Sequence, residues 1–551
     1  DASVPTAKIV YPANGARLGE FQVSNYTVLA QGTAVDKEAL SHVLWRVNGG
    51  TYELAAGAAN WTANVPVVPG TNVLEVKSVD ASGRESALAK STFYYVVQKP
   101  FTLVTNGLGF VTSKPSAIGT PVNGALLEVG RGYTLTALQP FTNGYIFTNW
   151  TASWQGQPLH VLQTNALTLT FVMQSNLVIA ANYIPNPFEA YAGIYNGLFY
   201  STNGVTHGSA GYVTMKTTSK FAYSGKLLVD GDAVSFSGKL NLDGTAQRVV
   251  SRAKFLKSDL NLSLALDFAG ASDTAIGTVE NPAGGWTSDL LADRWVWTTN
   301  AGQQATQYTN TYTLVVPGFA SNAQGPVGFG YGVALVDTLG RIKFSGALGD
   351  EHAIKQGATV SRNGQWPLYV PLYVEPRNVV INGAPKVLKE FQGSLIGWLT
   401  LAANTPAGKT NLAPQGTLDW IKTGWTNVYW PGGFTNQAAV IGSRHLPGVF
   451  GTRMYGFTNS TALVSEGDLA SAFANTVTLN TNNTMVSVTS ANTFKIGHAS
   501  KTGLMKGTFV HPQNGNLVEK WAGVMLQDYD YGRGTFLGPT NGGKLTLTPA
   551  D

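Results

Sequence analysis

Three pairs of acidic residues have a spacing that could support carboxylate chemistry. Glycoside hydrolysis uses two carboxyl groups about 5 to 10 Å apart, and residues at i and i+2 of a strand face the same side. The pairs are Asp230 and Asp232 in "VDGDAV", Asp350 and Glu351 in "LGDEH", and Asp528 and Asp530 in "LQDYDYG". Turn aspartates that bond their own backbone explain the first two pairs equally well. Asp528 and Asp530, interleaved with two tyrosines, are therefore the catalytic candidates, and a calcium ion could use the same oxygen ligands.

Large aromatic side chains are concentrated between positions 366 and 430. Their flat faces can stack on sugar rings, while neighbouring Asn, Gln and Asp side chains can bond sugar hydroxyls. The alternative is that these rings fill the interior of a β-barrel. The predicted binding residues are Trp366, Tyr369, Tyr373, Trp398, Trp420, Trp425, Tyr429 and Trp430. Of these, Trp425 and Trp430 are expected to be the most exposed.

Other catalytic and metal-binding patterns are missing from the sequence. The seven histidines never form His-x-His or His-x3-His, and there is no cysteine. The chain has no phosphate-binding Gly-x4-Gly-Lys-(Ser/Thr), no Gly-x-Ser-x-Gly and no His-Glu-x2-His. We therefore expect no metal site, no cofactor and no hydrolytic activity.

The composition is that of a folded, poorly charged β protein. Apolar residues make up 44% of the 551 positions and charged residues only 12%, with 63 Gly and 25 Pro that mark frequent turns. The net charge of +5 is spread along the chain, which argues against nucleic acid as a partner. No apolar run reaches the roughly 20 residues that span a membrane as a helix. The abrupt start at Asp1 fits an exported chain whose signal peptide has been removed, at the cell surface or outside the cell.

Residues 1–98 show short alternating segments separated by turns, which predicts an all-β sandwich. Trp45 lies in "VLWRVNGG", and a later strand reads "GTNVLEVKSVDASGRES". This stretch resembles bacterial immunoglobulin-like domains, with Ser78 at a position where that family usually has Ala. The resemblance implies an Ig-like sandwich.

Residues 99–185 begin at the joint Lys99-Pro100 and carry a second pattern. The segments "GRGYTLTA", "GYIFTNWT" and "TFVMQSNLVIAANY" follow one another in a fixed order. They resemble the divergent internalin-type B repeats of bacterial surface proteins. The resemblance implies a small β-grasp-like spacer module, with Trp150 and Phe171 in its core.

Residues 186–551 follow the stiff joint Pro185-Asn186-Pro187 and show loose internal repetition. Three segments each contain strands, turns and an apolar-(Ser/Thr/Lys)-Gly step, at Gly225, Gly346 and Gly507. Sheets of this size without helical cover must hide their edges, which predicts a large β-barrel domain, or two related barrels dividing near 300. Short helices are expected only at 469–474 and 288–294.

This last region also resembles a group of uncharacterised exported β-rich proteins of verrucomicrobial-type bacteria. The resemblance is carried by "GIYNGLF", "NGQWPLYVPLY", "GSLIGWLTL" and "WPGGFTN". It implies a surface location and a β-rich architecture, and it implies no activity.

Together these patterns predict an exported modular surface protein for adhesion or extracellular self-assembly, in fibres or a surface layer, with or without glycan binding. Its partners would be further copies of itself or surface glycans. The alternative is a polysaccharide-active enzyme in which the first two domains are accessories. A deep pocket with convergent carboxylates in the last domain would favour the enzyme.

Overall fold

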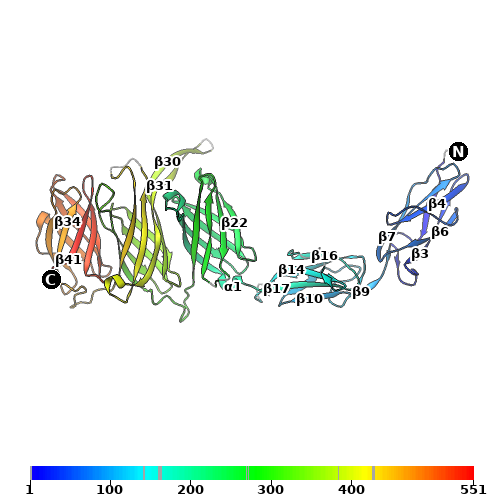
Figure 1. Cartoon of the computed structure of the whole chain (residues 1–551), viewed down its shortest axis with the longest axis horizontal. Helices are drawn as coiled ribbons and strands as arrows, with labels where there is room; N and C mark the ends of the chain where they lie inside the picture. Colours follow the sequence, from blue (N-terminus) through cyan, green and yellow to red (C-terminus); the bar gives the residue numbers. More distant parts are fainter. Residues whose placement is uncertain are drawn as a thin grey trace. The chain divides into compact units, whose positions relative to one another are not determined.

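Strands form almost all of the regular structure, so the predicted all-β class is confirmed. The computed structural model describes residues 3–139, 143–158, 164–268, 270, 272–381, 384–424 and 429–550. The chain divides into two units, Asp1–Asn186 and Pro187–Asp551 (Figure 1). The division falls inside the Pro185-Asn186-Pro187 segment, where two prolines restrict the backbone.

The first part of the N-terminal unit is a sandwich of two sheets. One sheet has the order β1-β3-β6 and the other β2-β8-β7-β4-β5. Alternating side chains from both sheets fill the core between them, with Trp61 and Phe93 fully buried. The strands are β1 (Thr6–Tyr11), β2 (Arg17–Leu18), β3 (Thr27–Val35), β4 (Leu40–Val47), β5 (Glu53–Leu54), β6 (Asn60–Pro66), β7 (Gly70–Asp80) and β8 (Ala89–Tyr95).

The second part of this unit is built from three small sheets, ordered β10-β17-β14-β15, β11-β13-β16 and β12-β9. Trp150 and Phe171 are buried in its core, as predicted. The Arg17 guanidinium forms an ion pair with Glu128, which joins the sandwich to this part. The strands are β9 (Gln98–Pro100), β10 (Thr102–Asn106), β11 (Phe110–Ser113), β12 (Leu126–Glu128), β13 (Gly132–Leu138), β14 (Tyr145–Trp154), β15 (Gln157–Pro158), β16 (Thr168–Val172) and β17 (Leu177–Pro185).

The C-terminal unit begins with the single-turn helix α1 (Phe188–Tyr191) and continues into three eight-stranded, nearly closed barrels. Barrel 1 contains β18 (Gly193–Tyr200), β19 (Gly211–Thr217), β20 (Ala222–Val229), β21 (Asp232–Lys239), β22 (Thr245–Val250), β23 (Leu260–Leu266), β24 (Thr274–Asn281) and β25 (Trp286–Trp295). Barrel 2 contains β26 (Asn310–Val316), β27 (Gly330–Val336), β28 (Arg341–Ala347), β29 (Ala353–Thr359), β30 (Gln365–Ile381), β31 (Ala384–Ala403), β32 (Leu412–Lys422) and β33 (Phe434–His445). Barrel 3 contains β34 (Asn459–Glu466), β35 (Phe473–Leu479), β36 (Met485–Ser487), β37 (Lys495–Ala499), β38 (Leu504–His511), β39 (Leu517–Leu526), β40 (Tyr531–Leu537) and β41 (Gly542–Pro549).

Each barrel is an up-and-down meander with one unpaired seam. In barrel 1 the first strand pairs with the last, β18 with β25, and the sheet ends at β21 and β22. The corresponding sheet edges are β29 and β30 in barrel 2, and β36 and β37 in barrel 3. The barrels therefore nearly close, and each keeps two neighbouring edge strands that do not pair with each other.

The structure contains three barrels, whereas one large barrel domain or two related barrels were expected. The division near 300 falls between β25 and β26, and a second division falls between β33 and β34. The repeated glycine step lies in the third strand of barrels 1 and 2, at Gly225 and Gly346, but in the fifth strand of barrel 3, at Gly507. Because the third segment is out of register with the barrels, the sequence repeat did not show the third barrel.

Both predicted helices are wrong. Residues 288–294 lie in β25, where Ser288, Leu290 and Ala292 point inward and are buried. Residues 470 and 471 form a bend, and β35 begins at Phe473. Cross-strand pairing and barrel packing override a weak helical pattern in such short segments.

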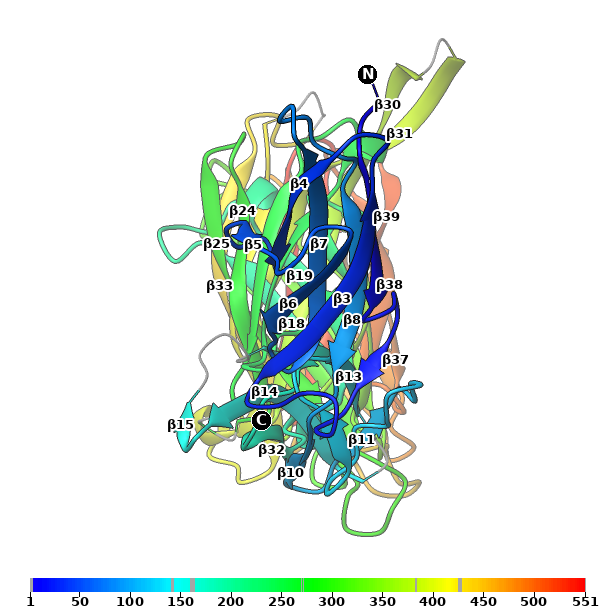
Figure 2. The ribbon, with the colours of Figure 1, turned by 90° about the vertical axis from the view of Figure 1, so that its right-hand side faces the viewer.

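The barrels of the C-terminal unit contact one another directly. Between barrels 1 and 2, the Asp273 carboxylate binds Arg294 of its own barrel and, at 2.7 Å, Nε of Arg362 from barrel 2. Between barrels 2 and 3, an apolar cluster includes Val315 and Val524, both fully buried. Strands β30 and β31 also extend past the other strands of barrel 2 as a two-stranded ribbon (Figures 1 and 2).

Candidate functional site

Most of the predicted aromatic binding residues are buried in barrel 2. Trp366, Tyr373 and Trp420 belong to its core and are 1%, 6% and 0% exposed. The Trp420 indole N–H donates to the Tyr373 hydroxyl at 2.9 Å. These three rings therefore fill the interior of the barrel, which was the alternative interpretation of the aromatic cluster. A buried ring offers no face to a sugar.

The other predicted rings lie at contacts between parts of the unit. Tyr369 is buried between barrels 1 and 2, where its hydroxyl accepts from the Gly231 N–H at 3.3 Å, and Trp398 packs against the same cluster. Tyr429 and Trp430 are half-buried, and their hydroxyl and indole N–H donate to the carbonyls of Gly538 and Asn322. Trp425 lies outside the described residues.

The carboxylates of Asp350 and Glu351 lie in different surroundings and do not form one site. The Asp350 carboxylate is enclosed in barrel 2, where it accepts from the Tyr373 hydroxyl at 2.6 Å and from the His352 N–H at 3.1 Å. Burial raises the pKa of Asp350. Glu351 instead faces a cleft between barrels 2 and 3.

Asp230 and Asp232 share one cation. The Lys257 ammonium binds both carboxylates, at 2.7 Å in the case of Asp232. His207 Nε2 lies 3.2 Å from Asp230 and 2.8 Å from the Phe391 carbonyl of barrel 2. Burial opposes ionisation of Asp230, but hydrogen bonds and charge from His207 and Lys257 outweigh it and lower the pKa. This cluster links the hairpin tip of barrel 1 to barrel 2.

Asp528 and Asp530 bind separate partners and do not converge. Oδ2 of Asp528 accepts from the side-chain amides of Asn404 and Asn411, at 2.8 and 2.9 Å, and from the Arg444 N–H at 3.0 Å. Asp530 has a positive φ of 56° and accepts from the Gly456 N–H at 2.9 Å. Asp528 thus joins barrel 3 to barrel 2, and Asp530 binds the segment that leads into β34.

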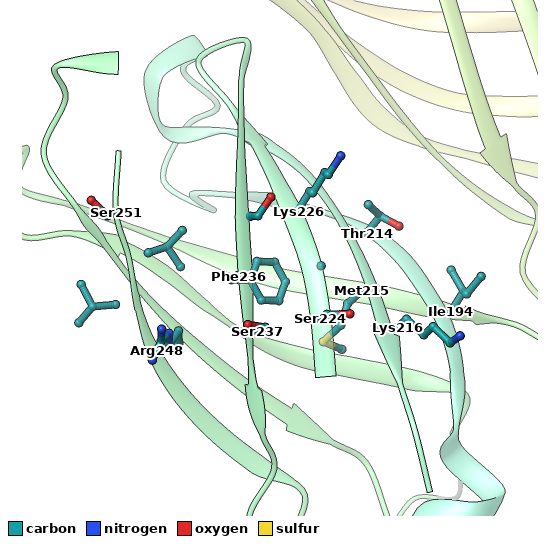
Figure 3. Close-up of a pocket in the computed structure, with 14 residues that line it drawn as sticks. Ile194, Thr214, Met215, Lys216, Ser224, Lys226, Phe236, Ser237, Arg248 and Ser251 are labelled. Atoms are coloured by element: carbon teal, nitrogen blue, oxygen red, sulfur yellow. The ribbon is translucent and has the colours of Figure 1, made fainter. Parts of the chain in front are cut away.

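A cationic hollow lies over the seam of barrel 1 (Figure 3). We call it the seam hollow, and its volume is about 780 Å³. It forms where β21 and β22 are joined by a short loop yet do not pair, so the two strands splay apart. The lining residues are Ile194, Thr214, Met215, Lys216, Ser224, Gly225, Lys226, Ser235, Phe236, Ser237, Arg248, Val249, Val250 and Ser251.

Three exposed cations reach this hollow from different strands. Lys216 and Lys226 stand on the outward faces of β19 and β20, because the alternating residues Met215 and Leu227 are buried. Arg248 lies on the same strand face as the buried Ala246 and Val250, so it comes from the inward side of β22 and enters the seam. Figure 3 shows Arg248 on one side of Phe236 and the two lysines on the other.

No acid neutralises these cations within the described part of the chain. None of the described lining residues is acidic, and Lys216, Lys226 and Arg248 form no ion pair with any described carboxylate. Hydroxyl groups of Thr and Ser residues surround the three charges. The hollow therefore offers positive charge and neutral hydrogen-bonding groups together, which suits an anion that also carries hydroxyls.

The hollow continues along the barrel surface into two further hollows. One, of about 540 Å³, shares Arg248 and Val249 with the seam hollow and is also lined by the acidic residue Glu280. The next, of about 890 Å³, shares Gln247, Ser263 and Thr278 with that one, and its charged lining residues are Lys239 and Asp289. Such a row of polar hollows provides room for several units of an extended polymer.

Sequence reasoning missed this site because its residues come from five strands without a motif. The available signal was the alternation in "MKTTSKFAYSGKLLVDGDAVSFSGK", which puts Lys and Ser at outward positions. The glycine step found in the sequence does belong to the site. A Cβ on Gly225 would lie 2.3 Å from the Thr214 carbonyl oxygen and 2.6 Å from the Phe236 ring, so only glycine lets β19 and β20 approach this closely.

The described residues show neither a metal-binding cluster nor a membrane-spanning helix. Among them, no group of three or more His, Asp or Glu side chains could hold a metal ion. No helix in the described part of the chain is long and apolar enough to cross a membrane.

Comparison with known proteins found similarity only to solved structures. No protein-family model matches the sequence, and no curated protein matches it. One similar structure is SGBP-B of the Bacteroides ovatus mixed-linkage glucan utilization locus, in complex with a mixed-linkage heptasaccharide, with 9% identity over 43% of this chain and 92% of that chain and a TM-score of 0.15. Another is the isotype 1 transferrin binding protein B from serogroup B Neisseria meningitidis, with 9% identity over 73% of this chain and 83% of that chain and a TM-score of 0.16. At these scores the superpositions carry no argument about function.

Proposed function

We propose that this protein is an exported surface protein that binds acidic polysaccharide through the seam hollow of barrel 1. The observation that supports this most strongly is the group Lys216, Lys226 and Arg248, exposed and without a carboxylate partner among the described residues, in a hollow rimmed by hydroxyls. A uronate carboxylate or a sulfate ester would pair with the cations, and sugar hydroxyls would bond the serine and threonine side chains.

The row of three hollows supports a polymer as the ligand. A single monosaccharide would occupy only part of the seam hollow, whereas a chain could continue past Arg248 into the neighbouring hollows. Those hollows are lined by Gln247 and Ser263 and by the acids Glu280 and Asp289, so the units bound there would offer hydroxyls, and the charged unit would lie at the three cations. Each exposed charge contributes up to about 1 kcal/mol. We therefore expect affinity to grow with chain length and to fall with salt.

A panel of immobilised polysaccharides tests the proposal. Polygalacturonate, a sulfated galactan and a neutral glucan are each compared for binding of the full chain and of the triple variant Lys216→Ala, Lys226→Ala, Arg248→Ala. The expected result is binding to at least one acidic polymer, loss of about tenfold or more in the triple variant, and no comparable binding to the glucan. Equal binding of the neutral and acidic polymers would contradict the proposal.

The matched control replaces exposed lysines elsewhere on the same unit. Lys343 and Lys355 stand on the outer face of barrel 2, away from the residues that line the seam hollow. The double variant Lys343→Ala, Lys355→Ala removes positive charge without touching the site. Its binding is expected to stay within about twofold of the parent.

Self-assembly is a second candidate function, and the β30–β31 ribbon favours it. Beyond the rest of barrel 2 the ribbon exposes Val374, Val380 and Val387, which are 48%, 69% and 63% exposed. Exposed apolar side chains on strands with unpaired edges are a template for pairing with another chain. Sedimentation of the full chain beside Val380→Lys and Val387→Lys tests this: assemblies lost in the variants support it, and a monomer at all concentrations contradicts it.

A further inference from the structure

A second cationic cleft lies where barrel 3 meets barrel 2. Its volume is about 740 Å³, and we call it the junction cleft. Barrel 3 contributes Lys495, Lys506 and Lys520, one from each of β37, β38 and β39. Barrel 2 contributes Tyr331, Ala347 and Glu351 as the opposite wall. This cleft shares no residue with the hollows of barrel 1.

The strand register explains why the lysines share one face. Thr508 pairs with both Lys495 and Lys520, and Lys506 pairs with Gly497 and Ala522 in the neighbouring row. The residues that alternate with these, including Met505, Phe509 and Trp521, are buried in the core of barrel 3. All three ammonium groups therefore point outward from a floor of small residues.

The floor of the cleft requires small side chains. A Cβ on Gly507 would lie 1.9 Å from the Lys495 carbonyl oxygen and 2.6 Å from Nε1 of Trp521. Gly497 lacks a side chain, and Ala522 and Thr508 have short ones. The long lysine side chains thus border an open trough and do not cover it.

The three lysines have no partner in the described residues. No described carboxylate lies within ion-pairing distance of Lys495, Lys506 or Lys520. Glu351 lines the same cleft and is held with a positive φ of 63°, a conformation that costs free energy in a residue other than glycine. The turn between β28 and β29 thus holds Glu351 at the edge of the lysine-lined trough.

We propose that the junction cleft is a second anion-binding site, which takes a carboxylate or sulfate group of an acidic glycan between the three lysines while Glu351 opposes it. The inference rests on the proposed function for the class of ligand, but it concerns different residues and does not require the seam hollow to be occupied. Two sites on one chain would let a long polymer bind at both, so that the second contact forms at a high effective concentration.

The titration of Glu351 gives this cleft a property that the seam hollow lacks. Burial, followed by the charges of Glu519 and Asp350, raises the pKa of Glu351 to about 7. Above this pH the Glu351 carboxylate repels an anion, and below it the neutral carboxyl does not. The affinity of the junction cleft for an anion is therefore expected to increase as the pH falls from 8 to 6.

The other groups around Glu351 do not produce that change. Burial raises the pKa of Tyr331 and of Tyr429 above the ordinary tyrosine value. Behind Glu351, burial raises the pKa of Asp350 and lowers the pKa of His352. The variant Glu351→Gln separates the Glu351 contribution from that pair, because it leaves Asp350 and His352 in place.

The test uses the full chain and trigalacturonate, whose carboxylates stay ionised over this range. Calorimetric titrations at pH 6, 7 and 8 compare the parent with Glu351→Gln and with the triple variant Lys495→Ala, Lys506→Ala, Lys520→Ala. The parent is expected to bind several-fold more tightly at pH 6 than at pH 8. Glu351→Gln is expected to bind equally at both pH values, and the triple variant to lose this site, with about tenfold weaker binding.

The triple variant of the seam hollow, Lys216→Ala, Lys226→Ala, Arg248→Ala, separates failure of the junction proposal from failure of the proposed function. If the seam triple variant loses binding while the junction triple variant and Glu351→Gln behave as the parent, the junction proposal is overturned and the proposed function stands. If only the junction variants lose binding, the seam hollow is overturned as the site and the junction cleft stands. A pH dependence that persists unchanged in Glu351→Gln also overturns the junction proposal.

Discussion

The carboxylate of Asp528 should stabilise the junction of barrels 2 and 3, and its loss should accelerate hydrogen exchange at the backbone amide of Arg444. Oδ2 accepts from Asn404, Asn411 and the backbone N–H of Arg444, all within 3.0 Å. Asn404 keeps a second acceptor, the Gly442 carbonyl at 3.2 Å. Among the bonds between described residues, the Asn411 amide and the Arg444 N–H therefore depend on Asp528 more than Asn404 does.

The magnitude follows from these bonds. A hydrogen bond to a charged group contributes about 1.5 to 3 kcal/mol to stability. Asp528 is partly exposed, so water replaces some of each lost interaction, and we assign about 1 kcal/mol to each of the three hydrogen bonds. Asp528→Ala should then lower the local free energy of opening by about 3 kcal/mol. Since 1.4 kcal/mol corresponds to a factor of ten, amide hydrogen exchange at Arg444 should accelerate about one hundred-fold.

The assay is hydrogen exchange of the full chain, read at residues 440–446 by mass spectrometry. Asp528→Asn keeps an acceptor oxygen but loses the charge, so it should have an intermediate effect. Asp530→Asn is the matched control, because its amide oxygen can still accept from the Gly456 N–H and it lies away from Arg444. Exchange at Arg444 in Asp528→Ala within threefold of the parent would refute the reasoning and leave Asp528 free for another role.

Three further outcomes are expected. Burial opposes ionisation of Asp273, but its two arginine partners outweigh this and lower its pKa. The ion pair between barrels 1 and 2 is therefore fully formed above the unfolded pKa of about 4, and it is lost as the pH falls through the lower pKa of the folded state. The thermal unfolding temperature of Asp273→Asn should depend less on pH in that range than the thermal unfolding temperature of the parent does. Trp420→Ala should lower the free energy of unfolding by about 3 to 5 kcal/mol, because the ring is fully buried, and a urea titration that shows less than 1 kcal/mol would contradict its place in the core. Gly225→Ala should destabilise barrel 1 by about 1 to 3 kcal/mol, whereas Gly357→Ala, where a Cβ meets no atom within 4 Å, should be nearly neutral in the same titration.

The sequence predicted the all-β class and the barrels because alternation is visible along single strands. It did not predict β25 as a strand, since Leu290 and Leu291 are both apolar although the first is buried and the second is 42% exposed. Two adjacent apolar residues hide the period of two that marks a strand. The number of barrels was likewise hidden, because it depends on which strands pair over long separations in the chain.

The site was harder to predict for a related reason. Trp366 and Trp420 are of a residue type that is common on sugar-binding surfaces, but their rings lie on the inward face of their strands. A ring cluster in sequence does not reveal which face of a barrel it occupies. Conversely, Lys226 and Arg248 are unremarkable in sequence and come together only because β21 and β22 separate at the seam.

The most direct test of the proposed function is a crystal structure of the full chain with a bound oligogalacturonate. The proposal predicts sugar density in the seam hollow, with one carboxylate between Lys226 and Arg248 and further units running toward Gln247. Density stacked on Tyr429 or Trp430, with the seam hollow empty at saturating ligand, would contradict it.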